Sequence, residues 1–184
     1  MKHNLSILIA VMGLQLFFCS CKIIPDPSVT LLQITLSEDF EIQTDSSDNS
    51  VDSVTFEARK SFDPNSNADF FSNRSKFAEL TIDKLKYRVK SIGFQTADSL
   101  IEGKFELLNP ATSQFETLAE DFNRKLIAGQ EVEVNLNPAG KASLEKLLTS
   151  ASPQFEIRMM GKMNKRPIHL ILAPEIKLSV KTKI

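Results

Sequence analysis

Few side chains of this sequence have the chemistry of a catalytic nucleophile or a metal ligand. The chain contains two cysteines, Cys19 and Cys21, and two histidines, His3 and His169. Cysteines two residues apart make a poor disulfide, so their spacing favours another use for the thiols. His169 lies in an apolar segment typical of a strand, where a structural or surface role is favoured over that of a base or ligand.

The sequence also lacks the motifs that bring catalytic groups together. It contains no Gly-x-Ser-x-Gly, no His-Glu-x-x-His and no glycine-rich phosphate loop. Glu131 and Glu133 fall on the face of a segment that we expect to be solvated, where nothing would separate their pKa values for acid and base work. The sequence therefore predicts a protein that is not an enzyme and needs no cofactor, although a carboxylate pair from distant strands stays open.

An acidic segment at 45–52, DSSDNSVD, offers oxygen ligands of the kind that calcium prefers. It lacks the central glycine and the closing glutamate of an EF-hand loop. We therefore expect a solvated turn here and no metal site.

The first 21 residues have the organisation of an export signal. Lys2 supplies a positive charge near the start of the chain, and an apolar run follows at 5–18. A run of this length is too short to span a bilayer as a stable helix, so it targets the chain and does not anchor it.

The apolar run ends in Phe18-Cys19-Ser20-Cys21, without a stop-transfer cluster. This ending resembles the lipobox of bacterial lipoproteins, in which a small residue precedes a cysteine that is acylated and becomes the new N-terminus. By this resemblance residues 1–20 are a lipoprotein signal peptide, cleavage falls between Ser20 and Cys21, and Cys21 carries the lipid. An ordinary secretory signal cut at another place is the alternative.

The resemblance implies a location as well as a modification. Two or more acyl chains make membrane attachment stable, because each buried methylene contributes about 0.8 kcal/mol. Residue 22 is Lys22 and not the aspartate that retains enteric lipoproteins at the inner membrane, so we expect the outer membrane, with the leaflet left open. Two tripeptides are similar to the O-glycosylation sequon of Bacteroidota envelope proteins: Asp52-Ser53-Val54 and Asp98-Ser99-Leu100.

Removal of the signal from the 184-residue chain leaves a segment of the size of one domain. We expect a short tether at 21–28 and a single domain at 29–184. The formal net charge is −1 and the charges are spread along the chain, so nucleic acid is not an expected partner. With Cys19 removed and Cys21 acylated, no thiol remains for a disulfide, and packing alone must stabilise the domain.

The elements that position these residues are strands, because apolar and polar residues alternate with a period of two along most of the chain. One convincing helix is expected at about 139–149. The pattern predicts an all-β protein, an antiparallel immunoglobulin-like β-sandwich of about eight or nine strands with that one short helix. The expected strands cover residues 30–36, 54–58, 82–92, 103–108, 115–119, 130–136, 155–159, 168–172 and 176–180.

Two further expectations concern the pairing of the first strands and the type of one segment. The first two strands are expected to pair with each other as a hairpin. The segment around Phe115 alternates like an edge strand, but Phe115, Leu118 and Phe122 also have the spacing of one face of a helix. We favour the strand.

The segment 63–76 is long for a connection within a compact domain and has no period of its own, which is typical of a functional loop. Phe70 and Phe71 are its best candidates for an exposed binding tip, with burial in the core as the alternative.

Four cations lie on one face of the strand expected at 82–92, with Tyr87 on the opposite, inward face. Pairing with outward acids such as Glu131, Glu133 or Glu106 is one interpretation. A positive strip that faces anionic lipid or glycan is the other. The cations are Lys84, Lys86, Arg88 and Lys90.

These observations predict an envelope lipoprotein whose domain acts as a non-enzymatic binding or assembly module. Its expected partners are the lipid bilayer, through acylated Cys21, and an envelope protein or glycan. A hydrolase of envelope polymer and a sugar-binding accessory lipoprotein are the alternatives. The absence of tryptophan and the presence of a single tyrosine disfavour the sugar-binding alternative, because sugars commonly stack on those side chains.

Overall fold

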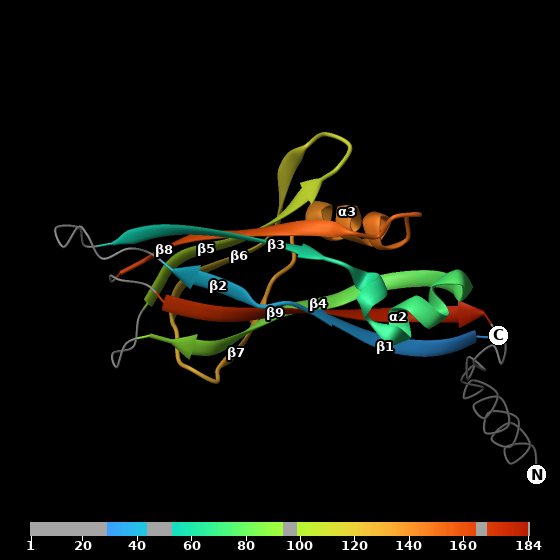
Figure 1. Cartoon of the computed structure of the whole chain (residues 1–184), viewed down its shortest axis with the longest axis horizontal. Helices are drawn as coiled ribbons and strands as arrows, with labels where there is room; N and C mark the ends of the chain where they lie inside the picture. Colours follow the sequence, from blue (N-terminus) through green and yellow to red (C-terminus); the bar gives the residue numbers. More distant parts are fainter. Residues whose placement is uncertain (1–28, 44–52, 94–98, 165–168, 184) are drawn as a thin grey trace, which may run out of the picture.

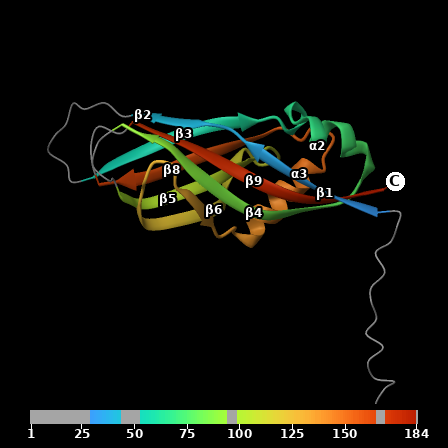
Figure 2. The ribbon, with the colours of Figure 1, turned by 90° about the horizontal axis from the view of Figure 1, so that it is seen from below.

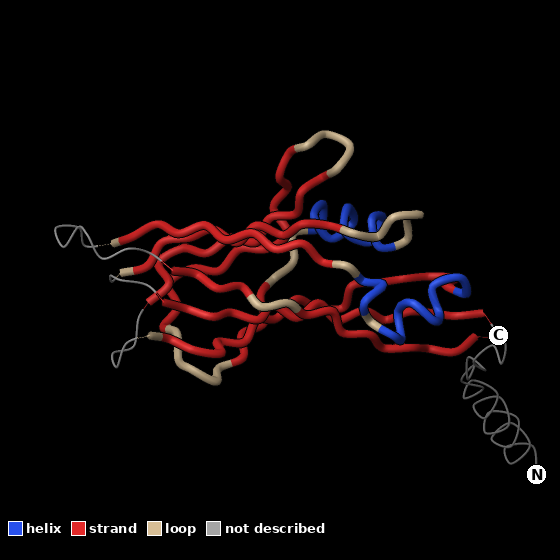
Figure 3. Tube along the Cα trace, viewed as in Figure 1, coloured by secondary structure: helices blue, strands red, loops and turns tan. Residues whose placement is uncertain are grey.

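The computed structural model describes residues 29–43, 53–93, 99–164 and 169–183, and in them the strands form two antiparallel sheets that face each other (Figures 1 and 3). One sheet has five strands and the other has four. This arrangement confirms the predicted all-β antiparallel sandwich. The strands are β1 (Val29–Ser37), β2 (Phe40–Gln43), β3 (Val54–Phe62), β4 (Phe77–Ile92), β5 (Ser99–Asn109), β6 (Gln114–Lys125), β7 (Glu131–Val134), β8 (Phe155–Met163) and β9 (His169–Lys183).

The last strand is the centre of the five-stranded sheet. β9 pairs with β4 along one edge and with both β1 and β2 along the other, and β7 extends the sheet beyond β4. The sequence pattern predicted two strands here, broken at Pro174. β9 instead continues through Pro174, which lies where its partner changes from β2 to β1. A residue without an N–H is tolerated at such an interruption of the ladder.

The four-stranded sheet has the order β3-β8-β5-β6. β3 therefore pairs with β8 and not with β1, so the expected hairpin of the first two strands is wrong. Alternation of apolar and polar residues specifies which face of a strand is buried, but it does not specify the neighbouring strand. After β2 the chain crosses from one sheet to the other.

The core consists of the inward faces of both sheets. Ring pairs reach from one sheet to the other, with 5.9 Å between the ring centroids of Tyr87 and Phe105 and 6.4 Å between those of Phe40 and Phe62. Phe62 also stacks on Phe155 at 5.0 Å. Such aromatic pairs contribute about 0.5–1.5 kcal/mol beyond the burial of their area.

A buried polar bridge also joins the two sheets. The Tyr87 hydroxyl on β4 donates to Asp121 Oδ2 on β6 at 2.7 Å, and Arg124 Nε donates to the same oxygen at 2.7 Å. Burial and this hydrogen bond raise the pKa of the Tyr87 phenol well above its ordinary value. The ring faces inward, as the alternation predicted.

The segment 63–76 is not an irregular loop. It contains the 3₁₀ turn Pro64–Ser66 (η2), the helix Ala68–Asn73 (α2) and a second 3₁₀ turn, Arg74–Lys76 (η3). The Asp63 and Asn67 side chains accept hydrogen bonds from the backbone N–H groups of Asn65 and Phe70, respectively, and thus start the first two elements. Elements of three to six residues are too short to show a period in the sequence, which is why the pattern missed them.

The predicted helix at 139–149 is α3, Pro138–Leu148. It begins where expected because the Asn137 side chain caps it and proline occupies its first position. α3 lies against β6 with backbone contacting backbone: a Cβ atom at Gly140 would lie 2.2 Å from the Thr117 carbonyl oxygen and 2.9 Å from Leu118 Cα. A glycine is required at this contact.

The contact predicts that Gly140→Ala destabilises the domain. Alanine favours a helix over glycine by about 1 kcal/mol. The clash of the added methyl group with the β6 backbone costs more than this gain. We therefore expect a net loss of about 1–3 kcal/mol in the free energy of unfolding, measured by urea denaturation.

The control is Ala139→Gly at the neighbouring exposed position, where only the helix propensity changes and the loss should stay near 1 kcal/mol or below. A Gly140→Ala variant that is more stable than the natural protein would contradict this packing of α3.

Candidate functional site

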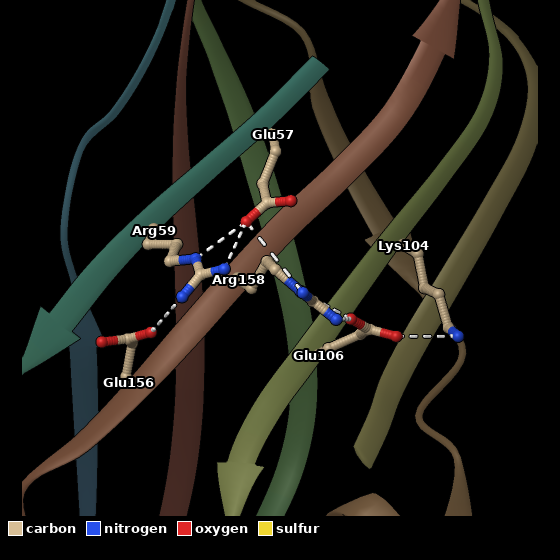
Figure 4. A network of polar contacts seen from close by, with 6 residues as sticks. All are labelled: Glu57, Arg59, Lys104, Glu106, Glu156 and Arg158. Atoms are coloured by element: carbon tan, nitrogen blue, oxygen red, sulfur yellow. Dashed lines mark hydrogen bonds and ion pairs between the residues drawn. The ribbon is translucent and has the colours of Figure 1, made fainter. Parts of the chain in front are cut away.

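The outer face of the four-stranded sheet carries a network of charged side chains from three adjacent strands, β3, β8 and β5 (Figure 4). These side chains point outward because they alternate with buried residues on each strand. We call them the outer-face network. Its members are Glu57, Arg59, Lys104, Glu106, Glu156 and Arg158.

Glu106 is the centre of this network and is 5% exposed although it lies on an outer face. Arg158 Nε donates to Glu106 Oε2 at 2.8 Å, and Lys104 Nζ lies 2.8 Å from Oε1. Burial acts to raise the pKa of the Glu106 carboxyl, but the hydrogen bonds from Lys104 and Arg158 outweigh it and hold the pKa below its ordinary value. The carboxylate stays ionised at neutral pH.

An aromatic ring covers the arginines of the network. The Arg158 guanidinium carbon lies 3.8 Å from the centroid of the Phe115 ring, and that of Arg59 lies 5.2 Å from it. Cation–π contacts of this kind contribute about 0.5–2 kcal/mol. Phe115 therefore lies over the arginine that pairs with Glu106.

A groove of about 440 Å³ lies on the same face, beside the outer-face network. Phe122, on β6, is 54% exposed and forms its most accessible apolar side. Charges of both signs surround the apolar part, and Lys104 lies directly opposite Glu120 in the ladder between β5 and β6. The principal lining side chains are Glu102, Lys104, Glu120, Phe122, Met160 and Lys162.

The arrangement has the chemistry of a binding surface. An exposed ring and a thioether offer apolar contact, and the lysines and glutamates around them offer ion pairs and hydrogen bonds. Glu106, with its lowered pKa, carries no proton to donate at neutral pH. Within the described ranges no three histidine, cysteine, aspartate or glutamate side chains cluster closely enough to hold a metal ion.

The predicted cation row lies on the outer face of the other sheet, and acids lie beside it. Lys84 Nζ is 3.2 Å from Glu133 Oε2, Lys86 Nζ is 3.7 Å from Glu131 Oε2, and Arg88 also pairs with Glu131. The fourth cation, Lys90, lies 2.7 Å from Asp39 Oδ1. This is the cross-strand pairing that we gave as one interpretation.

One predicted partner of the row is misplaced. Glu106 lies in the other sheet and pairs with Arg158 and Lys104. The hydrogen bond from Arg88 lowers the pKa of Glu131, as expected for an ionised, solvated carboxylate.

The two phenylalanines of segment 63–76 have different surroundings. Phe70 is fully buried and packs edge-on against Phe77, with 5.3 Å between ring centroids. Phe71 is 68% exposed. The expected exposed tip is therefore Phe71 alone, carried by a short helix and not by an irregular loop.

His169 begins β9 with an exposed side chain, and its Nε2 lies 3.3 Å from Glu41 Oε1 on the paired strand. A surface strand position is what the sequence favoured. The remaining candidates, which are Cys21, the segment 45–52 and parts of both sequon-like tripeptides, lie outside the described residues.

Sequence reasoning missed Phe115, Phe122 and Arg158 as members of one face. A β-bulge at Leu118 on β6 interrupts the alternation, because Phe105 pairs with Ala119 and the next residue pairs with Thr117. This interruption produced the helix-like spacing. The strand that we favoured for this segment is confirmed, but the bulge concealed which side chains face outward.

Comparisons with known proteins place this chain in no family: no family model matches it, and no match is found among curated proteins. Solved structures resemble it weakly. A structure of turnip yellow mosaic virus has a TM-score of 0.32 and 8% identity, over 84% of this chain and 96% of that chain. A structure of desmodium yellow mottle tymovirus has a TM-score of 0.33 and 11% identity, over 90% and 97%. Similarities of this size carry no information on function.

The helices of the sandwich are short, and α3 has 11 residues. Among the described residues, no helix combines the length and the apolar character needed to cross a bilayer.

The surroundings of Glu106 predict a pH-dependent contribution to stability. Because its pKa is lowered in the folded state, its ion pairs stabilise the fold above the ordinary carboxyl pKa of about 4, and this contribution disappears as the pH falls through the folded-state pKa. Glu106→Gln should lower the free energy of unfolding by about 2–3 kcal/mol at neutral pH. Urea denaturation at neutral pH and at about pH 3 measures both effects.

Glu102→Gln, at an exposed position of the same strand, is the matched control and should change stability by no more than about 0.5 kcal/mol. Equal losses in the two variants, or a Glu106→Gln loss that does not shrink in acid, would refute the assignment of Glu106 as the buried partner.

Proposed function

We propose that this protein is a lipoprotein of a bacterial cell envelope whose sandwich domain is a non-enzymatic binding or assembly module. The observation that carries the proposal is the sequence of its first 21 residues. An apolar run that is too short to span a bilayer ends in Ser20-Cys21, which resembles a lipobox. Acylation of Cys21 would attach the domain to the lipid bilayer at the outer membrane.

The start of the folded domain is compatible with such a tether. β1 begins at Val29, so seven residues separate it from Cys21. At full extension a segment of this length reaches roughly 28 Å. Pro25 and Pro27 favour extended backbone in it. The domain would thus stay close to the membrane that holds it.

The environment of the buried carboxylates supports a binding role over hydrolysis. Glu106 and Asp121 are the buried acids among the described residues, and each is hydrogen-bonded to an arginine. Hydrolysis of a glycan by paired carboxylates needs one acid that keeps its proton near neutral pH. The hydrogen bonds from Arg158 and Lys104 oppose that state at Glu106.

The groove beside the outer-face network is the surface that we assign to partner binding. It combines an exposed ring, Phe122, with lysines and glutamates in alternating positions. An envelope protein would find both apolar and charged contacts there. Phe122 also favours a second candidate, a sugar-binding accessory lipoprotein, because a sugar ring can pack on an exposed aromatic ring.

The lipid attachment predicts different behaviour for the two cysteines. Cys21→Ser should abolish incorporation of radioactive palmitate, because it removes the sulfur that is acylated. Cys19→Ser is the control and should keep the label, since this residue leaves with the signal. The measurement is palmitate labelling in the producing bacterium, followed by mass spectrometry of the mature N-terminus. Label that persists in Cys21→Ser, or that is absent from both variants and the natural protein, would rule out the proposed anchor.

The binding groove predicts a site-specific cross-link in the intact envelope. A photoreactive benzoylphenylalanine at position 122 should form an adduct with a defined envelope component. The same residue at position 127 is the control, because Ile127 is 55% exposed but does not line the groove. Mass analysis of the adduct distinguishes a protein partner from a glycan. Identical adducts from both positions, or none from position 122, would argue against this groove as the binding surface.

A further inference from the structure

Several segments that are distant in the sequence meet at one end of the sandwich. Val29 at the start of β1 pairs with Lys183 near the chain's end, and Phe77 at the start of β4 pairs with Thr182. α2 lies at this same end in both views (Figures 1 and 2). We call it the tether end, because the segment between Cys21 and β1 enters the domain here.

An exposed aromatic ring lies at the tether end on a well-held helix. Phe71 of α2 is 68% exposed, while the adjacent Phe70 is buried. The helix is fixed at its start by Asn67, which donates from Nδ2 to the Thr35 carbonyl at 3.2 Å. After it, Arg74 donates to the carbonyl oxygens of Ser150 and Ala151. The ring is therefore presented by a fixed element.

A second large apolar side chain is exposed on the neighbouring edge. Leu31, on β1 two residues from Val29, is 62% exposed. Single exposed apolar residues are common and need no partner. Leu31 and Phe71 differ from that case because both lie at the end of the domain where the tether enters.

The same end carries more cations than carboxylates among the described residues. Arg74 and Lys76 follow α2, and Lys181 and Lys183 end β9. The carboxylates nearby are Asp69 and Glu79, and Glu79 pairs with Lys181 at 2.6 Å. Lys76 and Lys183 are exposed and form no ion pair with any other described residue.

The tether decides which surface can meet these groups. If Cys21 is acylated, as the proposed function holds, the segment 22–28 keeps the start of β1 within roughly 28 Å of the bilayer. The tether end is then the part of the domain held nearest to the lipid. Exposed aromatic rings partition favourably into the headgroup region. Each lysine near an anionic lipid surface adds electrostatic attraction, which dissolved salt weakens.

We propose that the tether end rests on the anionic bilayer to which the lipid is anchored, with Phe71 in the headgroup region and Lys76 and Lys183 against lipid phosphates. This inference rests on the proposed lipid anchor. The outer face of the four-stranded sheet, with Phe122, then stays turned away from the lipid and open to a partner.

A tryptophan probe tests this orientation, because the natural chain contains no tryptophan. Phe71→Trp and Phe122→Trp each introduce a single indole at an exposed phenylalanine position. Each full-length protein is purified from membranes and reconstituted into vesicles of phosphatidylethanolamine and phosphatidylglycerol, with or without brominated acyl chains. We expect brominated lipid to quench most of the indole emission of Phe71→Trp and to leave that of Phe122→Trp nearly unchanged.

The cations are tested in the same vesicles. Adding Lys76→Glu and Lys183→Glu to Phe71→Trp should reduce the quenching several-fold in anionic vesicles. Lys84→Glu with Lys90→Glu, on the outer face of the five-stranded sheet, is the matched double reversal and should leave the quenching unchanged. Equal effects of the two double reversals would overturn the assignment of the tether-end cations.

Flotation of the vesicles separates failure of this inference from failure of the anchor. If Phe71→Trp floats with the vesicles while its indole remains unquenched, or is quenched no more than that of Phe122→Trp, the orientation is overturned and the anchor stands. Solubilised envelope proteins could instead shift the Phe71→Trp emission to the blue while brominated lipid leaves it unquenched. That result would place a protein at the tether end and would also overturn the proposed orientation. If the protein does not float with the vesicles, both the proposed anchor and this inference are refuted.

Discussion

The structure depends on the mutual burial of two sheet faces. The described residues contain no cysteine, so the two sheets are held together by packing and hydrogen bonds alone. β9 is central to this burial, because this 15-residue strand has neighbouring strands on both edges and its inward side chains contribute to the core along most of its length. Each strand that joins the sheet beside it gains a partner for its backbone and a cover for its apolar face.

Burial of the two faces also explains where polar groups can be tolerated. Asp121 lies between the sheets, and it is accommodated because Tyr87 and Arg124 donate hydrogen bonds to it. Glu106 lies on the outer face but is covered by neighbouring side chains, and Arg158 satisfies it in the same way. In both places an arginine donates a hydrogen bond to the carboxylate, which favours a defined arrangement of strands over chemical reactivity.

The domain presents two different surfaces for two proposed contacts. The tether end combines α2, the beginning of β1 and the end of β9, and it exposes single apolar side chains among charged groups in which cations outnumber carboxylates. The outer face of the four-stranded sheet combines a groove with charges of both signs. A membrane offers one flat, anionic surface, whereas a partner molecule offers varied shape and charge, so these surfaces suit different partners. One small domain would thus use its end for orientation and a sheet face for recognition.

Local patterns in the sequence determined those features of the protein that depend only on residues close together in the chain. Alternation of apolar and polar residues predicted the all-β class and the inward face of Tyr87, and the sequence also predicted a helix at about 139–149, where α3 lies. The motif that ends at Cys21 belongs to the same kind of signal, because a targeting enzyme recognises a short linear segment. It provides the hypothesis on location without any reference to the fold.

The tertiary structure decided what depends on residues far apart in the chain. The alternation of apolar and polar residues within a strand is the same whichever strand lies beside it. No short stretch of sequence therefore indicates that β3 pairs with β8. Glu106 is buried beside Arg158, which lies 52 residues later and donates to it, and Phe115 of a third strand covers that arginine. Phe70 is buried because it packs against Phe77 at the start of β4, whereas the adjacent Phe71 lies on the exposed side of the short helix α2. Burial and pairing are properties of contacts across the chain, and these contacts exist only after the sheets have formed.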